Sequence, residues 1–272
     1  MIGPTEIARS AAEDLAAIRS KRPLIHSITN YVVMNETANA ILCLGALPVM
    51  AHAIEEVEEM ASIAGAVVLN IGTLTPELVD SMVLAGQAAN AAGVPVVLDP
   101  VGAGATRLRT EACERLLAEV DVAVVRGNAG EIAILSGADG EVRGVESIGT
   151  YDVPRAAAAL ARRAGCVVAV TGAIDYVTDG RRAVSVSNGH PLMATITGSG
   201  CMSTTMVASF AAVQPDALLA SAEGLAVFGI AGEGAAERAS GPGSFHVGLY
   251  DELAALTAES VVNKVRVAEV YA

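Results

Sequence analysis

Residues 95–126, PVVLDPVGAGATRLRTEACERLLAEVDVAVVR, decide the fold of this chain of 272 residues. An apolar run at 95–99 and a second at 122–126 enclose a longer amphipathic segment. Because neither apolar run alternates with polar residues, both faces of each strand are expected to be covered, as in a parallel sheet. The stretch therefore predicts a strand, a crossover helix and a second, parallel strand.

The same alternation extends in both directions from this unit. Further strands are expected at residues 24–29, 47–50, 66–71 and 166–171, with helices in the gaps. Strands and helices in this order predict an α/β fold, a three-layer αβα sandwich with a mostly parallel central sheet. No linker, low-complexity tract or internal repeat interrupts the pattern, so residues 1–272 are expected to form a single domain.

Capping residues mark several helix boundaries. The first helix is expected to bury one stripe, made of Ile7, Ala11, Leu15 and Ile18. Asn30 is expected to cap the next helix, and Gly45 to end it. Thr75 and Pro76 open another helix in the order that helix N-termini favour.

The pattern changes after the strand at 166–171. Residues 176–178 and 183–186 are predicted to form a hairpin, with Asp179 and Gly180 in a type I′ turn. The hairpin would add an antiparallel edge to the sheet. Residues 192–196 have a β-like composition.

Two runs near the C-terminus are predicted to be core helices of one layer. Residues 201–213 carry no charge, and residues 217–239 are rich in small side chains. The longest uncharged stretch, 183–215, is interrupted by glycines and prolines, so it is not expected to span a membrane. The tail from Thr257 receives no assignment.

Composition narrows the possible partners. Lys and Arg together number 17 and Asp and Glu 30, a net charge of −13, which argues against binding to nucleic acid or to an anionic membrane. Hydrophobic residues make up 53% and charged residues 17%, so a folded core is expected rather than disorder. The four cysteines form no CxxC pair and the N-terminus has no secretory pattern, so a reduced, cytoplasmic protein is expected.

The segment Thr197-Gly198-Ser199-Gly200-Cys201 joins the β-like run to the uncharged helix. Two glycines that flank a small residue allow backbone N–H groups to converge at a helix N-terminus, where they favour an anion such as a transferring phosphoryl group. A tight turn that serves close packing explains the same residues equally well. The segment is neither a Walker loop, which needs GxxxxGK[ST], nor a dinucleotide fingerprint, which needs a third glycine.

Cys201 is expected in the first turn of that helix. A helix N-terminus lowers the pKa of a thiol, which makes Cys201 a candidate base or nucleophile. A lone cysteine more often behaves as an inert small hydrophobe, and this alternative stays open.

Polar side chains follow three of the predicted strands, at the carboxyl edge where α/β proteins bind ligands. Asp99 and Glu131 are candidate Mg²⁺ ligands, and Arg126 is a candidate phosphate contact. Asp99 also suits a turn, and Asn128 with Glu131 suits a local capping box that needs no metal. Thr171 is a candidate for a hydroxyl contact with phosphate or ribose, with a purely structural role as the alternative.

His26, Asn30 and Met50 flank the ends of two further strands and are candidates to line a substrate pocket there. Taken alone, His26 is more typical of a partly buried histidine with a hydrogen-bond partner, and Met50 more typical of a core residue. The remaining histidines share no spacing and are assigned no role: His52, His190 and His246.

Six stretches, in order along nearly the whole chain, resemble the hydroxyethylthiazole kinase family of the ribokinase-like superfamily. They are HSITNYVVMNETANAILCLGALPVMAHA (26–53), LDPVGAGATRLRTE (98–111), VVRGNAGEI (124–132), VTGAIDYVTDG (170–180), TGSGCM (197–202) and GPGSF (241–245). Glu36 and Ile54 depart from the family pattern, and Glu36 is placed to alter the pocket or an interface.

The resemblance implies ATP- and Mg²⁺-dependent phosphorylation of the primary hydroxyl of 4-methyl-5-(2-hydroxyethyl)thiazole, a step of thiamine biosynthesis. It places Met50 and Gly198 at the thiazole alcohol, Arg126 and Thr171 at ATP, and Asp99 with Glu131 at magnesium. From their positions in the sequence, Asn30 and His26 are further candidates at the alcohol and Asn128 at ATP. The resemblance puts Cys201 where most ribokinase-like enzymes have an aspartate base, beside the backbone amides of Gly198, Ser199 and Gly200. It also implies a homotrimer with pockets at subunit boundaries.

Three other functions stay open. A pyrimidine-alcohol kinase of the same pathway is chemically near, although the HSITN and PVMAHA segments favour the thiazole substrate. A nucleotide-dependent hydro-lyase of the same fold would share the glycine turn. A metabolite-binding regulator without catalysis would have kept the pocket alone.

Overall fold

The computed structural model describes residues 3–137 and 152–270. Its strands are β1 (Leu24–Ile28), β2 (Leu47–Val49), β3 (Ala66–Asn70), β4 (Val96–Asp99), β5 (Val124–Asn128), β6 (Val167–Thr171), β7 (Asp175–Thr178), β8 (Ala183–Val186) and β9 (Val267–Val270). Its helices are α1 (Pro4–Lys21), α2 (Met34–Leu44), α3 (Val57–Ile63), α4 (Pro76–Ala92), α5 (Arg107–Glu119), α6 (Ala129–Leu135), α7 (Val153–Ala164), α8 (Ser199–Ala211), α9 (Ala217–Arg238), α10 (Pro242–Ala255) and α11 (Ala258–Lys264), with a 3₁₀ helix η1 (Pro191–Thr195).

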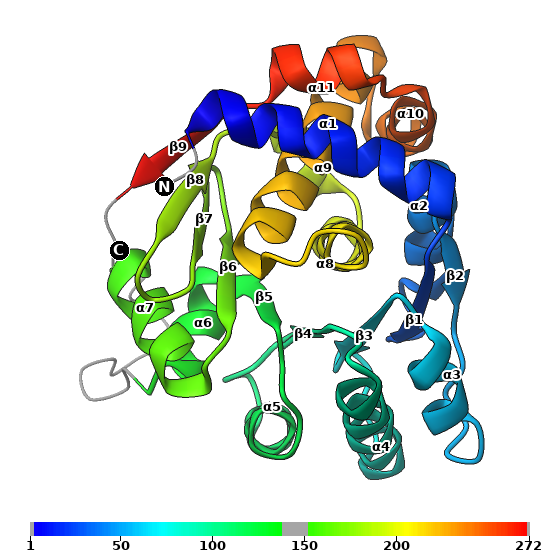
Figure 1. Ribbon diagram of the computed structural model, residues 1–272, viewed down its shortest axis with the longest axis vertical. Helices are drawn as coiled ribbons and strands as arrows, with labels where there is room; N and C mark the ends of the chain where they lie inside the picture. Colours follow the sequence, from blue (N-terminus) through cyan, green and yellow to red (C-terminus); the bar gives the residue numbers. More distant parts are fainter. Residues whose placement is uncertain (1–2, 138–151, 271–272) are drawn as a thin grey trace.

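The strands of the described residues form one sheet in the order β2-β1-β3-β4-β5-β6-β7-β8-β9 (Figure 1). The six strands from β2 to β6 in this order run parallel, and β7, β8 and β9 are antiparallel to their neighbours. Each of the six expected parallel strands is present within two residues of its predicted ends. α5 crosses over between the parallel pair β4 and β5, as residues 95–126 predict.

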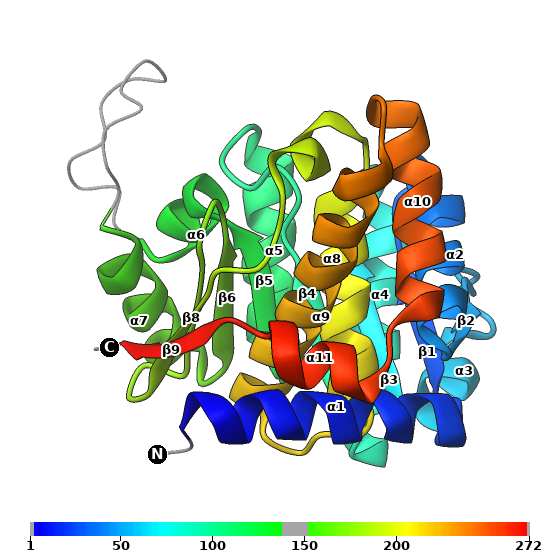
Figure 2. The ribbon, with the colours of Figure 1, turned by 90° about the horizontal axis from the view of Figure 1, so that it is seen from above.

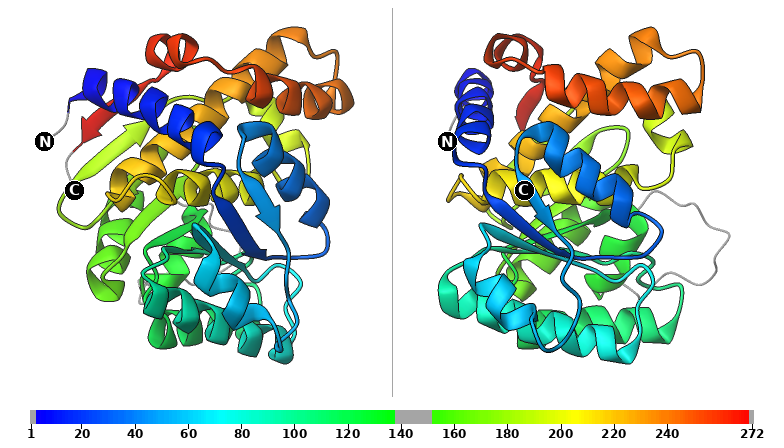
Figure 3. Two further views of the ribbon diagram at one scale, coloured as in Figure 1. Left: turned by 45° about the vertical axis from the view of Figure 1, so that its right-hand side comes forward. Right: turned by 90° about the vertical axis from the view of Figure 1, so that its right-hand side faces the viewer.

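Helices cover both faces of the sheet, and each face has its own hydrophobic core. The helices α1, α2, α8, α9, α10 and α11 share one core with the sheet, and α3 to α7 contribute to the other. The two views of Figure 3 show the sheet between these layers. The predicted three-layer αβα sandwich with a mostly parallel sheet is therefore confirmed.

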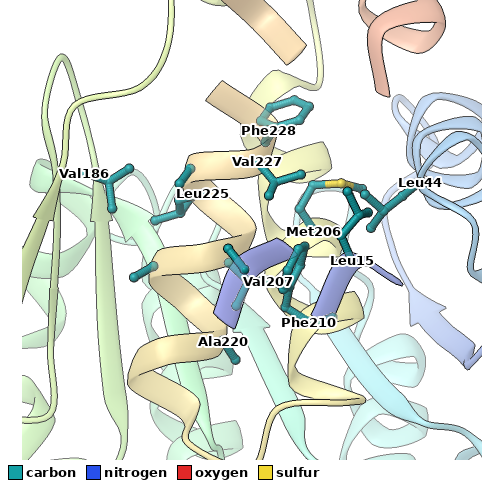
Figure 4. Packing of buried hydrophobic residues seen from close by; sticks show 14 of the residues in the cluster. Leu15, Leu44, Val186, Met206, Val207, Phe210, Ala220, Leu225, Val227 and Phe228 are labelled. Carbon is teal, nitrogen blue, oxygen red and sulfur yellow. The ribbon is translucent and has the colours of Figure 1, made fainter. Parts of the chain in front are cut away.

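The two apolar helices α8 and α9 pack side by side in the first of these cores. Phe210 of α8 and Phe228 of α9 are almost fully buried, and Figure 4 shows them with Met206 and Val207 among the apolar side chains of this core. α9 is the one helix of the described residues that is long and apolar enough to cross a membrane, and most of it is buried inside the fold. Burial against sheet and helices accounts for its composition.

The C-terminal tail completes both the sheet and one layer. α11 packs along α1, and β9 pairs antiparallel with β8 (Figure 2). The tail had no assignment from the sequence because its two elements are short, and each is stabilised by partners far away in the chain.

Helix boundaries follow the predictions with one exception. The stripe Ile7, Ala11, Leu15 and Ile18 is buried, as predicted. Gly45 ends α2 with φ +115°, and Thr75 caps α4 by accepting a hydrogen bond from Leu78 N. The prediction that Asn30 caps the next helix is wrong: α2 begins at Met34, because the Asn30 side chain instead accepts from Val32 N in a local turn.

Two predictions about the antiparallel side need correction. The hairpin β7–β8 is present, but its turn is not type I′, which requires positive φ at both central residues. The turn between Asp179 and Arg182 has positive φ at Gly180 and not at Arg181. The β-like run at 192–196 lies in η1 instead of a strand, since Pro191 starts the helical turn and His190 caps it by accepting from Leu192 N.

Glu223 is a carboxylic acid in the apolar interior of α9. It is fully buried, and it lies beside Asp14 and Ser10 of α1. Burial raises its pKa to about 9, and the neighbouring Asp14 adds to the rise. The folded state therefore prefers the protonated acid, whereas the unfolded chain ionises near the ordinary pKa of about 4.5.

The sign of the pH dependence follows from that difference. The cost of burying Glu223 is therefore smallest below pH 4.5 and grows as pH rises towards 9, by up to about 1.4 kcal/mol per pH unit. Glu223→Gln is therefore expected to raise the free energy of unfolding by a few kcal/mol at pH 8 and to change it little at pH 5. Urea unfolding at both pH values measures this, with Glu237→Gln, an exposed site on the same helix, as the control. An equal effect at the two pH values would contradict the expectation.

Candidate functional site

The carboxyl ends of the parallel strands bring polar side chains together at one edge of the sheet. Asn30 follows β1, while Asn70 ends β3 directly beside Asp99 at the end of β4. Arg126 lies in β5, and Thr171 ends the adjacent strand β6. The helix α8 packs on β1, β3 and β4. The residues that follow separate strands in the sequence therefore form one site.

A buried hydrogen-bond network joins Asn30, Asn70 and Asp99 to the start of α8. The Asn70 amide donates to Asp99 Oδ2 at 2.7 Å and to Cys201 Sγ at 3.2 Å. The Asn30 amide donates to Asn70 Oδ1 at 2.8 Å and to Cys201 Sγ at 3.7 Å. Thr204, one turn further along α8, donates its hydroxyl to Asp99 Oδ2 at 2.8 Å. Two amides and a hydroxyl thus fix the positions of Asp99 and Cys201.

The Cys201 thiol is held protonated. Burial first, and then the charge of Asp99, raise its pKa to about 12, because the Asn70 and Asn30 amides and the charge of Arg126 only partly oppose them. The expectation that the helix N-terminus lowers this pKa is wrong, because desolvation and a neighbouring carboxylate outweigh the helix dipole here.

Because the Cys201 thiol is protonated, we predict that it reacts slowly with alkylating reagents. At pH 7.5 only roughly 10⁻⁴ to 10⁻⁵ of Cys201 should be thiolate, so alkylation by iodoacetamide is expected to be slow. In metal-free buffer its rate should rise about tenfold per pH unit up to pH 10 without a plateau, because the thiolate fraction follows hydroxide. Peptide mass spectrometry separates Cys201 from the other cysteines, and the urea-unfolded chain is the control. A plateau below pH 9 would contradict the raised pKa.

The start of α8 has the form of an anion-binding cradle. Gly198 is its N-cap with φ +86°, and Met202 N is bonded to Gly198 O at 2.7 Å. The N–H groups of Ser199, Gly200 and Cys201 precede this first helical bond and point out of the helix end. A Cβ at Gly198 would lie 2.8 Å from Val33 Cγ1, so both its dihedral angle and its surroundings require glycine.

Arg126 lies against this cradle. A Cβ at Gly200 would lie 2.9 Å from Arg126 Nη1, so the guanidinium and the helix start are in close contact. Arg126 is 8% exposed, its Nη2 donates to Thr171 Oγ1, and its Nε has no hydrogen-bond partner among the described residues. Helix start and guanidinium together present unpaired donors and positive charge to one volume, which suits a phosphate group.

That volume is a cavity of about 520 Å³ between β6, α8, α9 and the segment that follows β8. Its polar lining comes chiefly from Arg126, Thr171, Asp175, Ser199 and Ser203, and its apolar lining from Met193, Leu225 and Phe228. A cavity with both charged and apolar lining residues matches a ligand with phosphate and an aromatic ring.

Asp99 and Glu131 stand near each other at adjacent strand ends. Asp99 is 1% exposed, and burial raises its pKa; Arg126, 4.0 Å away, lowers it, and the charge of Glu131 raises it. Glu131 accepts from Gly102 N and Asn128 N, each at 2.8 Å, while Asn128 Oδ1 accepts from Glu131 N. The capping box that was one interpretation of Asn128 and Glu131 is therefore present.

The donor chemistry of this pair fits a magnesium ion that keeps most of its waters. Among residues 3–137 and 152–270, no group of three or more His, Cys, Asp and Glu side chains is arranged as a metal cage. Mg²⁺ needs no such cage, since it commonly takes one or two carboxylates, water and ligand phosphates. In such a site Asp99 and Glu131 would be the two carboxylates, with Arg126 4.0 Å from Asp99.

The candidate substrate residues divide into two groups. Asn30 and Gly198 lie close to Cys201, and Met50 is partly exposed just after β2. His26 is fully buried within β1, where its Nε2 contacts Ala51 O at 2.8 Å and burial lowers its pKa. The structure thus brings Asn30, Gly198 and Cys201 together and leaves His26 inside the sheet.

Several residues of this edge were not singled out from the sequence. Asn70 had a signal, because it is the polar end of an apolar strand just as Asp99 is. His52 contacts Met50 O at 3.0 Å and Thr29 O at 3.1 Å, so it joins the ends of β1 and β2. Asp175 accepts from Gly172 N at 2.9 Å, and burial raises its pKa to about 6. Thr204 gave no signal, because it lies inside an uncharged helix.

Known structures share this fold. A ribokinase-like superfamily protein from Enterococcus faecalis superposes with a TM-score of 0.61 at 13% identity, over 88% of this chain and 89% of that one. The architecture is therefore ribokinase-like, with the polar site at the carboxyl edge of its sheet.

Closer relatives identify the family. The model of the hydroxyethylthiazole kinase family matches residues 15–259. A hydroxyethylthiazole kinase of Desulforudis audaxviator is 57% identical over 264 residues, 97% of each chain. A solved hydroxyethylthiazole kinase protein of Pyrococcus horikoshii is 49% identical with a TM-score of 0.89, over 96% of this chain and 99% of that one. This chain belongs to the hydroxyethylthiazole kinase family.

Proposed function

We propose that this protein transfers the γ-phosphoryl group of ATP to the hydroxyl of 4-methyl-5-(2-hydroxyethyl)thiazole, in the biosynthesis or salvage of thiamine. Family membership supports the alcohol kinase activity. The single structural observation that carries the proposal is the start of α8, with its N–H groups beside the Arg126 guanidinium and with Ser199 and Gly200 in the lining of the 520 Å³ cavity.

The cavity is the proposed nucleotide site. Arg126 and Thr171 would contact phosphates, and the apolar side chains of Leu225 and Phe228 would contact the base. Asn128, the third expected ATP residue, uses its side chain to cap α6, so we propose that it shapes the β5–α6 turn and only thereby affects the phosphates.

The alcohol is proposed to lie on the other side of Cys201, next to Asn30, Gly198 and Met50. Its oxygen attacks the γ-phosphorus, the bond between that phosphorus and the ADP oxygen breaks with its electron pair going to ADP, and the hydroxyl proton passes to water. Phosphoryl transfer has a loose transition state, so alignment and charge stabilisation matter more than early removal of this proton. The N–H groups of Ser199, Gly200 and Cys201 would hold the transferring group in place.

A protonated Cys201 is compatible with that mechanism. Because its thiol keeps its proton, Cys201 is proposed to pack against the reacting hydroxyl rather than to act as a base. Magnesium, held through Asp99 and Glu131, would neutralise the charge that develops on the phosphates. His26 is proposed to support the pocket from within β1, because it is fully buried.

We also propose that the protein works as a homotrimer in the cytoplasm. Three apolar side chains are exposed near the proposed alcohol site: Tyr31 is 72% exposed, Val32 64% and Ile54 46%. Tyr31 and Val32 follow β1, and Ile54 follows β2. A second copy would cover these apolar side chains and complete the pocket. Light scattering on a size-exclusion column measures the assembly, and the four free cysteines agree with a reducing compartment.

One coupled assay tests the activity. The protein is incubated with Mg-ATP and either the thiazole alcohol or the hydroxymethyl-pyrimidine alcohol, and the products are identified by mass. We expect thiazole phosphate and an equal amount of ADP. Pyrimidine phosphate alone would favour the other pathway kinase, ADP without a phosphorylated alcohol would favour a hydro-lyase, and no product would favour a regulator.

A further inference from the structure

One wall of the proposed nucleotide cavity is the segment between β8 and η1, residues 187–190, together with Met193 of η1. This wall belongs to no strand, so its position depends on what holds it. Two elements from outside the cavity do so: the last third of α9 and the residue that precedes β9.

Glu233 of α9 is the centre of that attachment. Its Oε1 accepts from Gly189 N at 2.7 Å and from the Asn188 amide at 3.2 Å. The same carboxylate forms a two-pronged pair with Arg266, with Nη2 to Oε1 at 2.6 Å and Nη1 to Oε2 at 3.1 Å. Burial alone would raise the pKa of Glu233, but these donors together lower it, so the carboxylate is charged.

Arg266 holds the wall from the other side. Its Nη2 donates to Ser187 O at 2.8 Å, and its backbone N donates to Asn188 Oδ1 at 2.7 Å. The Asn188 amide also donates to Lys264 O at 2.9 Å. Asn188 is 7% exposed. Its side chain thus makes its hydrogen bonds to Glu233 and to the C-terminal segment, and these bonds attach the wall to both.

Two glycines of α9 let the wall approach the helix backbone. A Cβ at Gly229 would lie 2.6 Å from Asn188 C, and a Cβ at Gly232 would lie 2.7 Å from Met193 Sδ. Gly189 has φ +137°, which a larger residue rarely adopts. Close packing and directed hydrogen bonds therefore specify one position of the wall.

We propose that Glu233 and Arg266 are positioning residues for the nucleotide: they hold residues 187–190 and Met193 against α9, so that the cavity keeps the width that a nucleoside triphosphate needs. This inference rests on the proposed function, because it takes the cavity as the ATP site. Neither side chain lines the cavity. They act on the nucleotide through Gly189, Asn188 and Met193, and not on the alcohol on the other side of Cys201.

The test uses Glu233→Gln, which keeps the size of the side chain and removes its charge, and Arg266→Met, which removes the two-pronged pair. We expect each to raise the KM for ATP and the Kd for ATP by about tenfold, with kcat and the KM for the thiazole alcohol within about twofold of wild type. Arg266→Lys keeps the charge and should recover part of the loss. The Kd is measured by titration calorimetry without the alcohol.

Arg238→Gln is the matched control. It removes the pair between Arg238 and Glu252, at 3.1 Å, which also involves α9 but contacts no part of the cavity. This variant should leave all constants unchanged. Thermal unfolding of each variant shows whether it is folded, and Arg266→Lys provides the comparison if Glu233→Gln does not fold.

Two results from the variants would overturn the inference. One is an unchanged affinity for ATP in folded Glu233→Gln and Arg266→Met, and the other is an equal loss for both substrates, which a general loosening of the fold would produce. If the wild-type protein binds ATP but phosphorylates no thiazole alcohol, the proposed activity fails while the Kd still tests these two residues. A wild-type protein that binds no ATP overturns both.

Discussion

Replacing Gly200 by valine is expected to lower kcat/KM by about 10²- to 10³-fold or more, the effect of losing preorganised N–H donors to a transferring group. The physical reason is that there is no room for a side chain at this position. A Cβ at this position would lie 2.9 Å from Arg126 Nη1, and the branches of valine would occupy the volume that the helix start faces. The guanidinium must then move away from the cradle.

Gly198→Val should be as damaging, with an additional loss of stability. Its φ of +86° is strained for a β-branched residue, and its Cβ would meet Val33. Cys201→Ala, by contrast, should keep measurable turnover, because the thiol is protonated and is not needed as a base. Cys201→Asp is expected to remain active as well, since an ionised carboxylate can accept the hydroxyl proton.

A matched control separates the cradle from a generic helix effect. Gly243 is the second residue of α10, as Gly200 is of α8, and a Cβ there would meet nothing within 4 Å. Gly243→Val should therefore leave the kinetics unchanged. Steady-state rates and melting temperatures of the purified variants decide the matter, and comparable kinetics for Gly200→Val and Cys201→Ala would refute the role of the cradle.

Asp99→Asn is expected to lower kcat by about 10²- to 10³-fold while leaving the fold intact. The carboxylate is buried at the centre of the site, where it accepts from Asn70 and Thr204 and faces Arg126. An asparagine has the same shape but no charge, so it would not balance the guanidinium and, in the proposed mechanism, would hold magnesium poorly.

We expect Asp99→Asn to lose activity without a comparable loss of stability. Burial raises the pKa of Asp99, so the ionised form is costly in the folded state, and a neutral amide removes that cost. We expect the Tm to stay within about 4 °C of wild type, which corresponds to about 1 kcal/mol. Thr204→Val, which removes one donor to Asp99 and keeps the shape, should reduce kcat by about tenfold. Activity of Asp99→Asn within tenfold of wild type would contradict this assignment.

The predicted and observed positions of the candidate residues in the fold agree where a local pattern carries the information. Asp99 and Thr171 are at strand ends because an apolar run stops there, and the Gly198–Cys201 turn begins a helix because its residues permit that geometry. The pKa of Cys201 differs from the prediction, because it depends on burial and on Asp99, which is about a hundred residues away in the chain. The sequence made His26 a candidate for ligand contact. In the structure it is fully buried, because β1 lies between β2 and β3 inside the sheet.

The amino-acid sequence by itself determined the αβα architecture, the six parallel strands and the glycine turn at the start of α8. These follow from apolar runs, helical periodicity and glycine content, all of which act over a few residues. Only the tertiary structure decided that Asn30, Asn70 and Thr204 converge on Cys201 and Asp99, and that Arg266 and Glu233 hold one wall of the cavity. Such contacts join distant parts of the chain, and their strength depends on burial, which no local pattern contains.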